Sequence, residues 1–139
     1  MSEPNYVEQL TERQKGFLPD HLGLEWLEAR PGFIKGRFEV KPHHLAPNTF
    51  LHAASVIALA DSACGYGCII SRPEGALNFT TIELKSNFLG TTREGGVSVE
   101  TSLVHGGRTT QVWDAVVKAE ATGKTIALFR CTQMILYPK

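Results

Sequence analysis

The segment LHAASVIALADSACGYGCII, residues 51–70, decides the fold of this chain because it is the longest apolar stretch. It carries one charged side chain, Asp61, and no Lys or Arg occurs in it. In a globular domain, a helix that is apolar on all sides is buried on all sides. His52, Asp61 and two glycines interrupt the run, and an ordinary polar sequence surrounds it. We therefore expect a buried central helix over residues 51–70 and not a membrane span.

The composition is that of a single domain spanning residues 1–139. The formal net charge is zero, which argues against the basic surface of a nucleic-acid-binding protein. No basic segment followed by an apolar run opens the sequence, so we expect no secretory signal. The three cysteines are odd in number and two of them lie in the apolar segment, which is not typical of a disulfide framework. A reducing, cytoplasmic location is the simplest interpretation.

The segments before residue 51 predict one helix and two strands. Residues 1–18 contain an amphipathic pattern typical of a short helix. Residues 22–40 alternate around the turn dipeptide Pro31-Gly32, which predicts two strands. Residues 41–50 hold two prolines and an asparagine and predict a loop.

The segments after residue 75 predict four more strands, because Thr, Val, Ile and aromatic residues dominate them. Gly106-Gly107 is a two-residue hairpin signal, and Thr122-Gly123 joins the last pair. The predicted strands cover residues 77–89, 96–105, 108–121 and 124–137.

The order helix, two strands, long helix, four strands indicates an α+β architecture with a mainly antiparallel sheet. A long curved sheet wrapped around one buried helix is the outline of the hotdog fold. An ordinary α+β sandwich is the alternative.

Asp61 is the leading candidate for chemistry. An ionised carboxylate in an apolar site is costly unless it is paired or solvated, and no helical neighbour compensates it. Either a partner comes from elsewhere, as for a structural carboxylate, or Asp61 faces a cleft. A carboxylate with few partners in a cleft is suited to act as a base or a nucleophile.

His52 cannot join Asp61 on the same helix, because nine positions place the two on opposite sides, about 13 Å apart along the axis. The start of the helix is nevertheless a good anion site, since its first N–H groups are unpaired and its dipole end is positive. Both features serve one reaction if two copies of the chain pack side by side. The geometry therefore predicts a dimer.

An oxyanion site together with an activated carboxylate is an acyl-transfer arrangement. The N–H of Ala53 would hold the carbonyl oxygen, and Asp61 would activate water or attack directly. No acid for a poor leaving group is evident, so a thioester fits as the substrate.

The sequence resembles the hotdog-fold acyl-CoA thioesterases of the phenylacetic-acid-degradation (PaaI) type. That family carries an Asn or Gln, then His-Gly-Gly at the helix start, then Leu-x-Asp, and this chain has APNTFLHAASVIALAD with the same spacing from His52 to Asp61. TTIELKSNFL resembles the family's Thr-x-x-Leu-x-x-x-Tyr/Phe strand, LVHGGRTT its Val-x-x-x-Gly-Arg hairpin, and TGKTIALFRCTQMI its last strand. The resemblance covers roughly residues 38–137.

The resemblance implies a role for each matching residue. Asp61 matches the catalytic carboxylate and Ala53, next to His52, the oxyanion-hole glycine. Thr81 matches a strand hydroxyl that helps to position water, and Phe88, which ends the same motif, is expected to contact coenzyme A. His105 and Arg108 match the hairpin that contacts coenzyme A, and a guanidinium also suits a CoA phosphate. The resemblance further implies a homodimer or a homotetramer, with an acyl-CoA substrate and no separate cofactor.

This chain departs from the family pattern at two places. His-Gly-Gly is His-Ala-Ala here, which keeps the backbone donor as long as the turn needs no positive φ. The family's Asn often lies six residues before His, where this chain has Ala46. Asn48 lies four before His52, so it is either a catalytic side chain or only a helix cap.

Three other interpretations are weaker or stay open. A metal site is not favoured, because His43 and His44 match no zinc spacing. Hotdog hydratases or dehydratases act on β-hydroxyacyl thioesters with a loop His and a helix acid, and the spacing here fits them less well. A non-catalytic acyl-CoA-binding module is the third possibility, in which Ala53 and Ala54 mark a decayed site.

Overall fold

The computed structural model describes residues 4–139. Its elements follow the chain in the predicted order. They are α1 (Tyr6–Arg13), α2 (Leu18–His21), β1 (Glu25–Arg30), β2 (Phe33–Glu39), the 3-10 turn η1 (Pro42–His44), α3 (Ala53–Ile70), β3 (Asn78–Phe88), β4 (Gly96–Gly106), β5 (Thr110–Ala119) and β6 (Thr125–Leu136).

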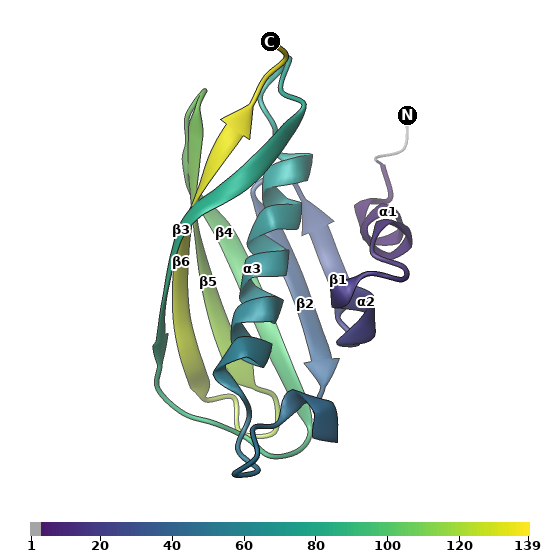
Figure 1. Ribbon diagram of the computed structural model, residues 1–139, viewed down its shortest axis with the longest axis vertical. Helices are drawn as coiled ribbons and strands as arrows, with labels where there is room; N and C mark the ends of the chain where they lie inside the picture. The colour runs from purple at the N-terminus through teal and green to yellow at the C-terminus, as the bar shows by residue number, and fades with distance from the viewer. Residues whose placement is uncertain (1–3) are drawn as a thin grey trace.

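All six strands form one antiparallel sheet in the order β1-β2-β4-β5-β6-β3. The sheet curves around α3, which runs along its concave face (Figure 1). Strand β3 follows α3 in sequence but lies at the far edge, where it pairs only with β6. This is the hotdog architecture expected from the sequence, and the order of the strands leaves β1 and β3 as the two edges.

The N-terminal helix predicted over residues 1–18 is wrong in its extent. Residues 1–3 lie outside the described part of the chain, and α1 ends at Arg13. Gly16 then has φ +82, a left-handed conformation that interrupts a helix and that glycine adopts readily. A separate short helix begins at Leu18, with Pro19 in its first turn.

Two local predictions also need correction. The loop predicted at 41–50 contains η1, and α3 begins at Ala53 because Leu51 pairs with Leu45 in an isolated bridge. In the β4–β5 hairpin, Gly107 N–H donates to the Thr110 carbonyl at 2.9 Å, so the tip is Arg108-Thr109 and not Gly106-Gly107. No residue of this hairpin has a positive φ, which excludes the type I′ or II′ turn that the glycines suggest.

Close packing fixes α3 against the sheet. Nine of its residues are buried, and a Cβ on Gly67 would lie 2.6 Å from the Trp113 ring. Trp113 Nε1–H donates to Gln111 Oε1 at 2.8 Å, and Gln111 Nε2 donates to the carbonyl of Ser71 at 3.0 Å, just after the helix. By length and hydropathy α3 would also suit a membrane span. Here it is the core helix of the domain, as predicted.

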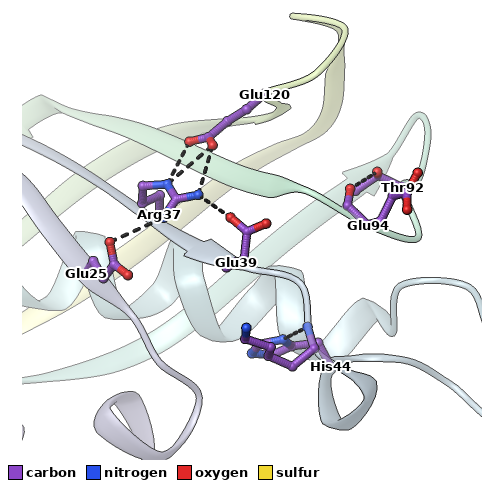
Figure 2. Close-up of polar contacts among 8 residues, drawn as sticks. Glu25, Arg37, Glu39, His44, Thr92, Glu94 and Glu120 are labelled. Atoms are coloured by element: carbon purple, nitrogen blue, oxygen red, sulfur yellow. Dashed lines mark hydrogen bonds and ion pairs between the residues drawn. The ribbon is translucent and has the colours of Figure 1, made fainter.

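The most extensive charge cluster lies away from α3. Arg37 on β2 binds Glu25, Glu39 and Glu120, with N–O distances of 3.2, 2.7 and 3.0 Å (Figure 2). Its neighbour on the strand, Phe38, is fully buried, so Arg37 projects from the opposite, convex face. This cluster joins strands and has no part in a site next to the central helix.

Candidate active site at the central helix

The start of α3 presents an unpaired backbone donor. His52 caps the helix, and its Nδ1 accepts the N–H of Ala54 at 2.9 Å. The N–H of Ala53, the first helical residue, has no acceptor among residues 4–139. Both His52 and Ala53 are exposed. A ligand can therefore reach this N–H, where the helix dipole also favours negative charge.

His44 holds the helix start in place. Its carbonyl accepts the His52 N–H at 3.0 Å and the Ser55 hydroxyl at 2.8 Å. Its buried ring accepts the Lys41 N–H at Nδ1 (2.9 Å; Figure 2), and its Nε2 lies 2.7 Å from the Leu22 carbonyl. Burial lowers the pKa of this imidazole, which favours its neutral form. Because protein atoms engage both ring nitrogens, His44 is a structural anchor and not a metal ligand.

Asp61 lies in the middle of α3 and is half-buried. Its Oδ1 is buried and has no hydrogen-bond partner among the described residues. Burial raises the pKa of Asp61, and the hydroxyl of Thr81 partly opposes that by lowering it. Thr81 faces α3 from strand β3. The structure therefore brings Asp61 and Thr81 together, as the resemblance implied.

Asp61 and the helix start do not meet within one subunit. Ala53 and Asp61 are eight helical residues apart, which is about 12 Å along the axis. His52 lies on the opposite side of the helix from Asp61. The separation argued from helix geometry is thus present in the structure, and the two groups do not meet within one chain.

Asn48 is not the cap of α3, because His52 takes that position. Its Oδ1 accepts the N–H of Phe50 at 3.1 Å, which makes a local turn in the loop before the helix. Thr49 in the same turn has φ +71. The helix-cap interpretation of Asn48 is therefore wrong. The ring of Phe50 carries the Arg93 guanidinium 4.2 Å from its centre, a contact that no sequence pattern indicated.

The residues predicted to bind coenzyme A are divided between the two ends of α3. His105 and Arg108 lie at the β4–β5 hairpin, which is near the C-terminal end of α3 because Gln111 bonds the Ser71 carbonyl. Tyr137 O–H donates to the Arg108 carbonyl at 2.5 Å, and the Arg108 guanidinium lies 5.1 Å from the centre of the Tyr137 ring. Phe88 is 46% exposed at the other end of the molecule, where β3 ends (Figure 1). One subunit does not bring Arg108 to the start of α3.

Gln133 is a neighbour of the site that sequence reasoning missed. It is fully buried on β6, and its Oε1 accepts the Thr81 hydroxyl at 2.7 Å. The only signal in the sequence is its place between Cys131 and Ile135, at an inward-facing position of an alternating strand.

Comparison with known proteins identifies the family and the fold. The family model of the thioesterase superfamily matches residues 48–126. A 1,4-dihydroxy-2-naphthoyl-CoA hydrolase of Listeria monocytogenes is 28% identical over 115 residues, 83% of this chain and 92% of that protein.

Two solved structures share the fold over nearly the whole chain. A mutant of thioesterase PA1618 from Pseudomonas aeruginosa superposes with a TM-score of 0.89 and 26% identity, over 97% of this chain and 96% of that one. The PaaI protein of the E. coli phenylacetic acid degradation operon superposes with a TM-score of 0.83 and 22% identity, over the same shares. The chain therefore belongs to the thioesterase superfamily and is a thioester hydrolase with the hotdog fold.

Proposed function

We propose that this protein hydrolyses an acyl-CoA or aryl-CoA thioester to the free acid and CoA, with Asp61 as base or nucleophile and the start of α3 as the oxyanion site. One observation carries the proposal. The central helix has two groups of opposite polarity that find no partner among residues 4–139, the buried Oδ1 of Asp61 and the exposed N–H of Ala53.

The reaction needs both groups. In the base route, Asp61 takes a proton from water, and the water oxygen bonds to the thioester carbon. The carbonyl oxygen becomes an oxyanion that accepts the Ala53 N–H. When the intermediate collapses, the C–S bond breaks and the proton on Asp61 passes to the sulfur. In the nucleophile route, Asp61 attacks the carbon and releases the thiol, and water then hydrolyses the acyl anhydride. Burial raises the pKa of Asp61, which makes the carboxylate a stronger base for the proton of the attacking water.

The two groups belong to one site if a second subunit pairs along the edge strand β3. This strand has eleven residues, and its free edge pairs with no other strand of the sheet. Leu84 and Phe88 are opposite the buried residues Cys131 and Ala127, so they face the helix side, yet they are 39% and 46% exposed. The buried Ser86 hydroxyl between them has no hydrogen-bond partner among residues 4–139. A second copy would cover this apolar strip.

An antiparallel pair places the groups at matching heights. Suppose that a two-fold axis perpendicular to α3 crosses the helix pair at the height of residue 57. Ala53 and Asp61 are each four residues from that height, on opposite sides of it. The rotation therefore places Ala53 of one subunit beside Asp61 of the partner subunit. The same rotation carries the partner's β4–β5 hairpin, with Arg108, past the start of α3 by about 15 Å along the axis, because Ser71 lies 14 residues from the level of residue 57 and Ala53 lies four. Arg108 would then bind a phosphate of CoA at the rim. The CoA thioester class is supported by the Listeria relative, which is named a CoA hydrolase.

The decisive experiment is a panel of acyl- and aryl-CoA thioesters, in which free thiol and double-bond absorbance are followed separately. Thiol release supports hydrolysis. A change in enoyl absorbance without thiol release would support the hydratase or dehydratase instead, and binding without either signal would support a non-catalytic module.

Two further measurements resolve the finer points. A single turnover in ¹⁸O-labelled water places the label in the acid product if Asp61 is the base. If Asp61 is the nucleophile and water attacks the Asp61 carbon of the anhydride, the label goes into the Asp61 carboxyl and the acid carries an unlabelled enzyme oxygen. Sedimentation at the assay concentration should show a dimer or a larger assembly, and an active monomer would contradict the shared site.

A further inference from the structure

Gln133 places a primary amide where the fold could hold an apolar side chain. It is fully buried, and its neighbours on the inward face of β6, Cys131 and Ile135, are 1% and 4% exposed. Its Oε1 accepts the Thr81 hydroxyl at 2.7 Å, and its Nε2 donates to Cys131 Sγ at 3.4 Å. Burying an amide costs free energy unless its hydrogen bonds are made, and a thiol is a weak acceptor. The amide therefore gives the fold little that an apolar residue would not.

Thr81 has one hydroxyl proton and two neighbours that can use it. The Thr81 hydroxyl donates to Gln133 Oε1, and Asp61 Oδ1 has no donor within the described part of the chain. The same hydroxyl is close enough to Asp61 to lower the pKa of its carboxyl. An ionised Asp61 needs a donor from Thr81, whereas a protonated Asp61 needs an acceptor. The arrangement in the structure, with the Thr81 proton turned away, suits the protonated form.

A half-turn of the Gln133 amide gives the arrangement that the ionised form needs. The two ends of a side-chain amide are nearly identical in shape, so the turn requires no extra space. Nε2–H then donates to Thr81 Oγ1, and the Thr81 proton is free to turn toward the Asp61 carboxyl. The thiol of Cys131 can donate to Oε1 in that orientation, because sulfur serves as a weak donor or acceptor. Each orientation leaves Thr81 and Gln133 hydrogen-bonded.

We propose that Gln133 is a positioning residue for Asp61 and acts through Thr81. Its amide presents Nε2–H to Thr81 when Asp61 is ionised and Oε1 when Asp61 carries the proton taken from water. This inference rests on the proposed role of Asp61 as a group that cycles between the two forms. Gln133 and Thr81 gain and lose no proton. The Thr81 hydroxyl only changes the neighbour to which it donates.

The titratable groups around Asp61 do not offer a second route for the proton. Among the described residues, burial and Thr81 account for the shift in the Asp61 pKa, and no Lys, Arg or His contributes to it. Cys64, one turn further along α3, is buried, and burial raises the pKa of its thiol well above the ordinary value. It therefore stays protonated over the range in which the enzyme would be assayed.

The test is a double-mutant cycle on kcat with Thr81→Val and Gln133→Met. Thr81→Val should lower kcat by about tenfold, the loss expected for one hydrogen bond to a charged group, with KM unchanged. Gln133→Met should lower kcat measurably but by no more than Thr81→Val. The double variant should be no slower than Thr81→Val, because Gln133 acts only through Thr81. Thr81→Ser, which keeps the hydroxyl, should restore most of kcat. Losses that multiply in the double variant would overturn the proposal.

Gln111→Met is the matched control. Gln111 is 1% exposed, pairs with Gln133 across β5 and β6, and bonds only Trp113 and the Ser71 carbonyl. It should lose stability but keep kcat. An equal loss of kcat in this variant would make the Gln133 effect structural and overturn the proposal.

A measurement on the unmodified side chain keeps the test independent of whether Gln133→Met folds. The ¹⁵N resonance of Gln133 Nε2 should shift as Asp61 titrates in the wild-type protein and stay constant in Asp61→Asn. A resonance that ignores the titration would overturn the relay. If Asp61→Asn keeps full activity, the proposed function itself fails. If Asp61→Asn is inactive but Gln133→Met is as fast as wild type, only the role of Gln133 fails.

Discussion

Ala53→Pro removes one backbone N–H from the proposed oxyanion site and changes little else. Ala53 is the first residue of α3, where proline is well tolerated because that N–H has no partner within the helix. The residue before a proline must be extended, and His52 already has φ −69 and ψ 136. The side chain is exposed, so the ring enters no packed region. Proline also restricts the unfolded chain, which should leave the free energy of unfolding unchanged or raised by about 0.4–1 kcal/mol.

Activity should fall while stability is kept. Loss of one oxyanion-hole donor costs about 10²–10³ in kcat, or about 2.7–4 kcal/mol of transition-state stabilisation. The assay is thiol release from the best acyl-CoA of the panel, combined with a denaturant titration of the same samples. Ala53→Ser keeps the N–H and is the control. A folded Ala53→Pro protein with wild-type kcat would show that this N–H holds no oxyanion and would refute the reasoning.

The same variant tests whether the site is shared between subunits. Ala53→Pro and Asp61→Asn each inactivate both sites of their own dimer. After mixing and re-association in equal amounts, about half of the dimers are mixed, and each mixed dimer carries one site with both groups intact. Activity should therefore recover to about a quarter of wild type. No recovery, in a mixture proven to exchange subunits, would place Ala53 and Asp61 in the same subunit's site or in none.

Three further outcomes are expected. Asp61→Asn should lower kcat by about a hundredfold or more, because Asn cannot take a proton. The same variant should also have a higher free energy of unfolding than wild type at neutral pH. Burial raises the pKa of Asp61 in the folded state, so the stability of the wild-type protein falls as pH rises from 3.8 through that folded-state pKa. Denaturant titrations should therefore show the two proteins equally stable below pH 3.8. Arg108→Ala should raise KM for acyl-CoA with kcat nearly unchanged and leave a truncated thioester without the nucleotide unaffected, and equal losses on both substrates would make Arg108 structural. Treatment with EDTA should leave kcat unchanged, since the proposed chemistry uses only Asp61, Thr81 and backbone donors, and a loss restored by a divalent metal would contradict it.

The strands and the central helix could be predicted because their signals are local. The apolar run at 51–70 can be accommodated only in the core of a small domain. The four segments after residue 75 alternate strongly between apolar and polar residues. The predicted bounds of these strands differ from the observed ones by at most two residues. The order of the strands is a different matter. Strand β3 pairs with β6 at the edge of the sheet and not with the strands next to it in sequence. This pairing joins residues about fifty positions apart, and no local pattern in a single sequence indicates it.

The candidate site was predictable only where helix geometry decides it. The separation of His52 from Asp61 follows from 3.6 residues per turn and holds in the structure. The role of Asn48 does not follow from any such rule, because a loop residue bonds whichever N–H the turn brings to it, and here that is Phe50. Gln133 escaped notice for a related reason. Its importance lies in a pairing with Thr81, 52 positions away, and not in its own neighbours along the chain.

The close packing of the Trp113 ring against Gly67 has a consequence for the range of substrates that the enzyme accepts. Sliding α3 along its axis by one turn, about 5.4 Å, would bring Ala63 or Cys64 to the place of Gly67, and the Cβ of either would clash with the indole. The close contact between the helix backbone at Gly67 and the indole therefore blocks the sliding motion. The spacing between the proposed oxyanion site and the carboxylate is then a constant of the fold. Acyl groups of different length must be accommodated by the partly exposed side chains along β3, and substrate range should change through substitutions on that strand while the rate on the best substrate is kept.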